Sequence, residues 1–141
     1  MAVSNRALTR PVDVLAVGAH PDDVELSCAA TLLRLRAKGK SIGLLDLTRG
    51  ELGTRGTPEI RRQEATAAAQ RLGAEERVTL ELPDGFLNQS QEHKLEVIRG
   101  LRYFRPQVVL MNAPDDRHPD HGNAAQLTKE AIFLAGLKNI Q

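Results

Sequence analysis

The sequence has few aromatic and sulfur-containing side chains. Its 141 residues include three Phe, one Tyr, no Trp and one cysteine, Cys28. A single cysteine excludes both an internal disulfide framework and a cysteine-rich zinc module. So few aromatic rings also argue against a stacking platform for single-stranded nucleic acid. We therefore expect an aliphatic core and no nucleic-acid partner.

An excess of one charge and long apolar runs are absent as well. Lys and Arg number 19 and Asp and Glu 18, so a net charge of +1 gives no general attraction to nucleic acid or anionic membranes. No apolar run is long enough to predict a membrane-spanning helix, and residues 1–11 are too polar for a signal peptide. With 41% hydrophobic and 26% charged residues, the composition is typical of a globular protein. We expect one cytoplasmic domain without a membrane partner.

Segments with strand-like and helix-like patterns alternate along the chain. Short apolar runs predict strands at 12–18, 42–47, 78–82 and 108–111. Helical spacing and end signals predict helices at 24–38, 58–72, 95–104 and 120–137. This order predicts an α/β fold, a Rossmann-like parallel sheet with helices on both faces in three α/β/α layers. In such sheets a ligand lies at the carboxyl ends of the strands.

The first predicted strand is followed by a polar cluster of the sequence His-Pro-Asp-Asp. A doubly wound nucleotide-binding module, one alternative, would have glycines and backbone N–H groups at this turn to hold phosphate. The chain has His20, Asp22 and Asp23 there instead, and carboxylates beside an imidazole suit a divalent cation. Either aspartate could also simply cap the next helix. As a set at a strand end, these residues favour a metal site.

A second polar cluster, residues 115–121, follows the fourth predicted strand and contains His118 and His121. Either histidine alone could be a solvated loop residue. Together with the first cluster they provide the nitrogen and oxygen ligands that catalytic zinc requires. Cys28 could be a further ligand, but a cysteine in an apolar helix is more often a small buried residue. His93, on the polar face of a predicted helix, is expected to be solvated.

A third cluster, residues 48–57, follows the second predicted strand and is rich in glycine and arginine. Its arginines could bind a carboxylate, although the segment lacks the lysine of a phosphate-binding loop. A mobile surface loop is the alternative. Arg61 and Arg62 open the next helix, and because they are adjacent, one must face solvent while the other could lie over the site.

Two of these motifs carry a resemblance to a known family. Residues 18–25 (GAHPDDVE) and 118–121 (HPDH) resemble the paired signatures of the PIG-L/LmbE-like zinc-dependent N-deacetylases. Residues 46–57, 82–85 and 116–122 are similar to the bacillithiol-biosynthesis branch, whose members deacetylate N-acetylglucosaminyl-malate. The resemblance extends from about Val12 to the end of the chain.

The resemblance implies a zinc hydrolase and gives roles to individual residues. It implies three zinc ligands: His20, Asp23 and His121. Asp22 would be the general base, and His118 would stabilise the oxyanion or act as the acid. Asp120, between the two histidines, would orient an imidazole.

The resemblance also bears on the substrate and on the extent of the domain. Arg61 and Arg117 match positions that face the malate carboxylates, so the implied partner is a small N-acetylglucosaminyl conjugate. Related proteins continue beyond this point, so we expect residues 1–141 to be the N-terminal catalytic portion of a single deacetylase domain, with a C-terminal part missing. A deacetylase for another N-acetylglucosamine or thiol conjugate, and a non-catalytic metal-binding fragment, are the alternatives. The sequence leaves the oligomeric state open, and a homo-oligomer is compatible with it.

Overall fold

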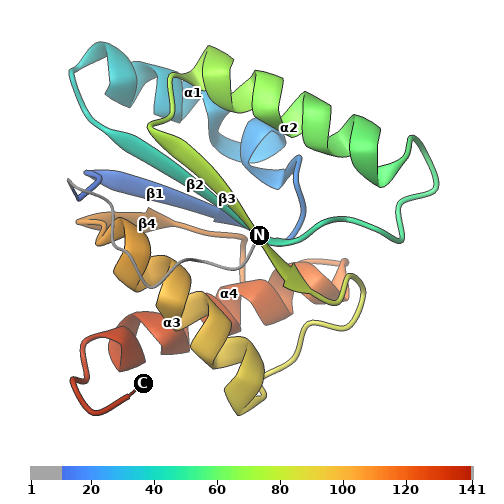
Figure 1. Cartoon of the computed structure of the whole chain (residues 1–141), viewed down its shortest axis with the longest axis vertical. Coiled ribbons are helices and arrows are strands. Elements are labelled where there is room, and N and C mark those ends of the chain that lie inside the picture. Colours follow the sequence, from blue (N-terminus) through green and yellow to red (C-terminus); the bar gives the residue numbers. More distant parts are fainter. Residues whose placement is uncertain (1–10, 141) are drawn as a thin grey trace.

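The computed structural model describes residues 11–140 and contains a parallel sheet between two pairs of helices (Figure 1). The elements are β1 (Val14–Gly18), α1 (Asp23–Ala37), β2 (Ile42–Thr48), α2 (Pro58–Leu72), β3 (Glu76–Leu82), α3 (Gln91–Phe104), β4 (Val108–Leu110) and α4 (Pro119–Ala135). The strand order is β3-β2-β1-β4. Helices α1 and α2 cover one face of the sheet, and α3 and α4 cover the other. This arrangement confirms the predicted three-layer α/β fold.

The two central strands, β1 and β2, are apolar because helices cover both of their faces. Leu15 and Val17 of β1 belong to the core cluster shared with α3 and α4, whereas Val14 and Ala16 pack with α1 and α2. The strands pair in parallel register, from Val14 opposite Ile42 to Gly18 opposite Asp46. Among residues 11–140 no helix is long and apolar enough to cross a membrane. The prediction that residues 1–11 are not a signal peptide stays a prediction, because residues 1–10 lie outside the described part of the chain.

Helix α3 begins four residues earlier than predicted, at Gln91 instead of 95. Its first turn is polar and lacks apolar periodicity, but the Ser90 side chain accepts a hydrogen bond from the His93 N–H at 3.3 Å and so caps the helix. His93 is only 6% exposed, and its Nδ1 accepts a hydrogen bond from the Asn88 N–H at 3.3 Å. The prediction that His93 is solvated is therefore wrong, because His93 lies on the buried face of α3, one turn before Val97.

Strand β3 also begins two residues earlier than predicted, at Glu76, because a buried ion network includes its second residue, Arg77. The guanidinium donates to Asp46 of β2 through Nε at 2.7 Å and Nη2 at 2.8 Å, and it pairs with Glu25 of α1. It also donates to the carbonyls of Pro21 at 2.9 Å and Ala65 at 3.1 Å. Burial disfavours the charge on Arg77, but the two carboxylates more than offset it and raise the pKa of the guanidinium. Arg77 thus links both strands, two helices and the segment after β1.

Removing this guanidinium should leave the fully buried carboxylate of Asp46 without its partner. We expect Arg77→Met to lower the free energy of unfolding by about 3–5 kcal/mol, measured by urea denaturation. Arg36→Met is the control, because Arg36 pairs with Glu75 at 3.0 Å through side chains that are 43% and 47% exposed. The control should cost less than about 1 kcal/mol. Equal stabilities of the two variants would contradict this account of the network.

Candidate metal centre

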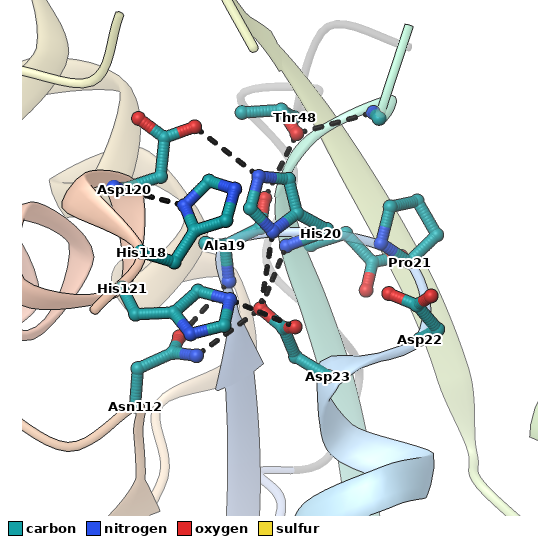
Figure 2. Close-up of polar contacts among 12 residues, drawn as sticks. Ala19, His20, Pro21, Asp22, Asp23, Thr48, Asn112, His118, Asp120 and His121 are labelled. Atoms are coloured by element: carbon teal, nitrogen blue, oxygen red, sulfur yellow. Dashed lines mark hydrogen bonds and ion pairs between the residues drawn. The ribbon is translucent and has the colours of Figure 1, made fainter. Parts of the chain in front are cut away.

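The three predicted polar clusters meet at the carboxyl ends of the strands, where the chain leaves β1, β2 and β4 (Figure 2). Strand order reverses between β1 and β4, so the two connections diverge there and leave room for a ligand. His20 and Asp23 come from the connection after β1, and His118 and His121 come from the start of α4. The convergence predicted from the sequence is confirmed.

The backbone of residues 19–21 is held in place by side chains from neighbouring strands. The Ala19 N–H donates to Asn112 Oδ1 at 3.0 Å, and the Ala19 carbonyl accepts from the N–H of Thr48 at 3.0 Å and its Oγ1 at 2.9 Å. The His20 N–H donates to Asp23 Oδ2 at 3.0 Å, and Arg77 holds the Pro21 carbonyl. Because each of these polar groups has a partner, the segment that carries His20 has a defined conformation.

The carboxylate of Asp23 lies between two imidazoles. His20 Nδ1 is 3.5 Å from its Oδ2, and His121 Nε2 is 3.2 Å from its Oδ1. One ligand atom from each of these three residues lies within 4.8 Å of the others. The alternative that the aspartates serve only as helix caps is not supported. Asp22 occupies the N-cap position of α1 but makes no capping hydrogen bond, and Asp23 Oδ2 accepts from His20 and Asn112.

The outer nitrogen of each of these two imidazoles faces a carboxylate. His20 Nε2 lies 3.0 Å from Asp84 Oδ1 and 3.1 Å from Asp120 Oδ2. His121 Nδ1 lies 3.0 Å from Asp116 Oδ2. Metal-binding histidines commonly donate their second ring N–H to a carboxylate, which fixes the tautomer and the ring orientation. The residues therefore fit a divalent metal ion bound by His20 Nδ1, Asp23 and His121 Nε2.

The electrostatic environment of His20 and Asp23 also favours a cation at this position. Burial alone would lower the pKa of His20, but hydrogen bonds and charges from Asp23, Asp120 and Asp84 raise it to about 9. Burial would likewise raise the pKa of Asp23, but its contacts with His20, Asn112 and His121 lower it to about 2. The surrounding carboxylates thus favour positive charge at this point of the structure, whether a proton or a metal ion carries it.

A second group within the described residues, His20, His118 and Asp120, also brings ligand atoms within 4.8 Å. Asp120 is engaged elsewhere, because Oδ2 accepts from the Gly85 N–H at 2.7 Å and Oδ1 from the Leu87 N–H at 3.2 Å. The Asp120 carboxylate contacts the imidazole of His20, and the Asp120 backbone N–H contacts that of His118. We therefore assign the candidate metal position to the group around Asp23. Cys28 lies in neither group and packs, half-buried, against the core beneath α1.

The other predicted site residues surround this group. Asp22 lies to one side of it, with a side chain 57% exposed, and its Oδ1 is 3.4 Å from Arg61 Nη2. The His118 ring stacks on His121 at a centroid distance of 4.8 Å, and its Nδ1 accepts from the Asp120 N–H at 3.2 Å. With Nδ1 accepting, a proton on the neutral His118 ring is at Nε2.

Of the two adjacent arginines, Arg61 turns towards the site and Arg62 is exposed. Arg61 Nη1 donates to the Gly50 carbonyl at 2.9 Å. Gly50 has a φ of +64°, and a Cβ there would come within 2.5 Å of that nitrogen, so only glycine fits under the guanidinium. Residues 48–57 are therefore attached to the site at this point. Arg117 is exposed.

Sequence reasoning gave no role to four residues that hold the site together. These are Thr48, Asp84, Asn112 and Asp116. Thr48 and Asp116 belong to the polar clusters that the sequence analysis placed after strands, and Asp84 and Asn112 each lie two residues beyond a strand, a position that could have drawn attention to them.

The fold and the site define a class, namely a doubly wound α/β protein with a candidate metal centre where the strand order reverses. The profile of the PIG-L family, described as GlcNAc-PI de-N-acetylase, matches residues 15–132. The chain therefore belongs to the PIG-L family, as the resemblance predicted.

Individual relatives agree with this assignment. A diacetylchitobiose deacetylase of Thermococcus kodakarensis is 33% identical over 136 residues, which cover 89% of this chain and 51% of the relative. A 1D-myo-inositol 2-acetamido-2-deoxy-alpha-D-glucopyranoside deacetylase of Catenulispora acidiphila is 28% identical, covering 91% of this chain and 53% of the relative. The crystal structure of the conserved protein TT1542 from Thermus thermophilus superposes with a TM-score of 0.87 at 47% identity, covering 92% of this chain and 59% of that one. The chain thus spans about half to three-fifths of the length of these proteins.

If His20, Asp23 and His121 hold a metal ion, the imidazole of His20 is required for metal binding. We expect His20→Ala to lose the bound zinc, measured as zinc per chain after dialysis by elemental analysis. His93→Ala is the matched control, since His93 is also a buried histidine but lies outside the group. A His20→Ala protein with the zinc content of the wild type would refute the assignment.

Proposed function

We propose that the protein is a zinc-dependent N-deacetylase that removes the acetyl group from an N-acetylglucosaminyl conjugate. The observation that supports it best is the Asp23 carboxylate shared by His20 and His121, each with a further carboxylate on its outer nitrogen. We further propose that the metal centre lies wholly within this chain, which forms the N-terminal catalytic part of a single α/β domain. The nucleotide-binding alternative is weaker, because carboxylates occupy the turn where phosphate would bind.

Residues around the proposed metal position can each contribute to amide hydrolysis. When bound, a zinc ion would polarise the amide carbonyl and make water a stronger nucleophile. Asp22 follows the same turn as the ligands, yet its exposed carboxylate is not engaged by the imidazoles and pairs loosely with Arg61. It can therefore accept the proton of the attacking water and pass it to the leaving amine.

His118 can stabilise the oxyanion that develops during the attack. Its Nδ1 accepts the Asp120 N–H, so its Nε2–H is the donor available to the substrate. This tautomer favours the oxyanion role over that of a general acid, because a neutral imidazole N–H is a poor proton donor. The buried Asp120 fixes the ring through its backbone while its carboxylate serves His20.

His118→Ala should separate metal binding from turnover. We expect it to keep its zinc and to lower kcat by about 10²- to 10³-fold, the usual cost of one oxyanion donor. The release of free amine from the substrate and the zinc content are measured on the same full-length protein. Unchanged kcat would remove His118 from the mechanism. A metal-loaded wild type that releases no amine would favour the non-catalytic alternative.

For the substrate, we propose an N-acetylglucosaminyl conjugate with a carboxylate-bearing aglycone, of which N-acetylglucosaminyl-malate is the candidate. Arg61 contacts the Gly50 carbonyl and the Asp22 carboxylate, so it would bind a substrate carboxylate while it also holds residues 48–57 at the site. Arg117 is exposed two residues before the helix that carries His121 and can meet an aglycone without breaking an internal contact. The deacetylases among the relatives act on diacetylchitobiose and on an inositol conjugate, which have no such carboxylates.

A panel of three substrates tests this choice. We expect the highest kcat/KM for N-acetylglucosaminyl-malate, compared with the inositol conjugate and diacetylchitobiose. Arg117→Ala should lower the value for malate about 10-fold or more, the effect of losing a hydrogen bond between charged groups, and leave the neutral substrates unaffected. Arg62→Ala, an exposed arginine, is the control. Equal rates on all three substrates would leave no reason to assign malate.

A further inference from the structure

We propose that Asp84 is a positioning residue of the metal centre. It holds the His20 imidazole with Nδ1 towards Asp23, and it ties that orientation to the glycine-rich loop, residues 48–57. This inference rests on the proposed metal site, and no role for Asp84 follows from the sequence motifs. Asp84 lies two residues beyond β3, at the same edge of the sheet as the other site residues.

The contact between Asp84 and His20 is short and buried. Asp84 Oδ1 lies 3.0 Å from His20 Nε2, and the two side chains are 8% and 9% exposed. A carboxylate buried in this way requires partners for its charge. Oδ2 accepts a hydrogen bond from the Leu52 N–H at 2.8 Å, while Oδ1 faces the imidazole. Asp84 is thus an acceptor that requires a proton on Nε2 and leaves the Nδ1 lone pair for the metal.

Asp120 also faces His20 Nε2, but backbone groups determine its position. Its carboxylate accepts from the N–H groups of Gly85 and Leu87, contacts that persist whichever way the imidazole turns. It therefore supports the histidine without contacting residues 48–57. Of the two carboxylates that face His20 Nε2, it is Asp84 that also contacts the glycine-rich loop.

The loop contact is reinforced from both sides. Leu52 N–H donates to Asp84 Oδ2, and in return the Asp84 N–H donates to Glu51 Oε1 at 3.0 Å. On the other side, Arg61 holds the Gly50 carbonyl and approaches Asp22. The loop therefore lies between one side chain that reaches the proposed base and one that reaches a proposed metal ligand. A change in the position of the loop would therefore affect both Asp22 and His20.

Two substitutions distinguish an action on His20 from simple support of the loop. In Asp84→Asn, the amide oxygen can still accept the Leu52 N–H, but the amide N–H₂ group then faces His20 Nε2 and is the wrong partner for a protonated nitrogen. Asp84→Ala removes both contacts. Asp115→Asn is the control, because it removes the same charge from an exposed carboxylate in the loop before α4.

Zinc affinity is measured by competition with a chromogenic chelator on the full-length protein, and ¹⁵N NMR of the zinc-loaded protein reports which nitrogen of His20 carries the proton. We expect both Asp84 variants to bind zinc about 10- to 100-fold more weakly, with a smaller share of His20 rings protonated at Nε2 because only Asp120 still accepts there, while Asp115→Asn behaves as wild type. Melting curves of the metal-free proteins show whether the fold persists.

Normal zinc affinity and an unchanged tautomer in Asp84→Asn, with loss only in Asp84→Ala, would show that Asp84 merely supports the loop and would overturn the proposal. A wild-type protein that binds no zinc would instead refute the metal site itself, and the role of Asp84 with it. The two failures are thus distinguishable, because the first leaves the wild-type affinity intact.

Discussion

The carboxylate of Asp23 is the contact on which the rest of the site depends. It joins the segment after β1 to Asn112, 89 residues away, and to His121 at the start of α4. It also accepts the backbone N–H of His20, three residues before it. A single side chain thus sets the distance between the two imidazoles and closes the gap where the strand order reverses. Without it, the segment after β1 and the segment from β4 to α4 would be joined near the proposed ligands by fewer contacts, such as those of His20 with Asp120 and of Ala19 with Asn112.

The segment that leads to Asp23 is fixed in part by Arg77. A buried guanidinium with two carboxylate partners is costly to desolvate and gains little net stability over apolar packing. Here the network also holds the Pro21 carbonyl, next to a proposed metal ligand. This geometry explains why a charged network lies within an otherwise aliphatic sheet: it defines the position of the turn, which apolar contacts do not do, because they lack direction.

The sequence predicts the fold and the central site residues for the same reason. Apolar runs and helical spacing reveal a parallel sheet, and the ends of its strands bring His20, Asp23 and His121 to one edge. The missing parts depend on contacts that no local pattern encodes. Asp84 acquires its importance from a histidine 64 positions earlier, and Arg77 extends β3 because its charge finds Asp46 across the strand pair. His93 is polar but lies on the buried face of α3, one turn before Val97, and a backbone N–H five residues away provides the partner for its Nδ1.

Under the proposed function, the buried residues would fix the metal position and exposed residues would determine the choice of substrate. His20, Asp84 and Asp120 are buried and fixed by strands or backbone N–H groups, so they can change little without disturbing the metal position. Arg117 and most of residues 48–57 are exposed and make fewer contacts within the described structure. Relatives that share this fold are named as deacetylases of different sugar conjugates. Differences in specificity should therefore arise in exposed residues such as these, and the proposed coupling through Asp84 would link the position of residues 48–57 to the proposed metal ligand His20.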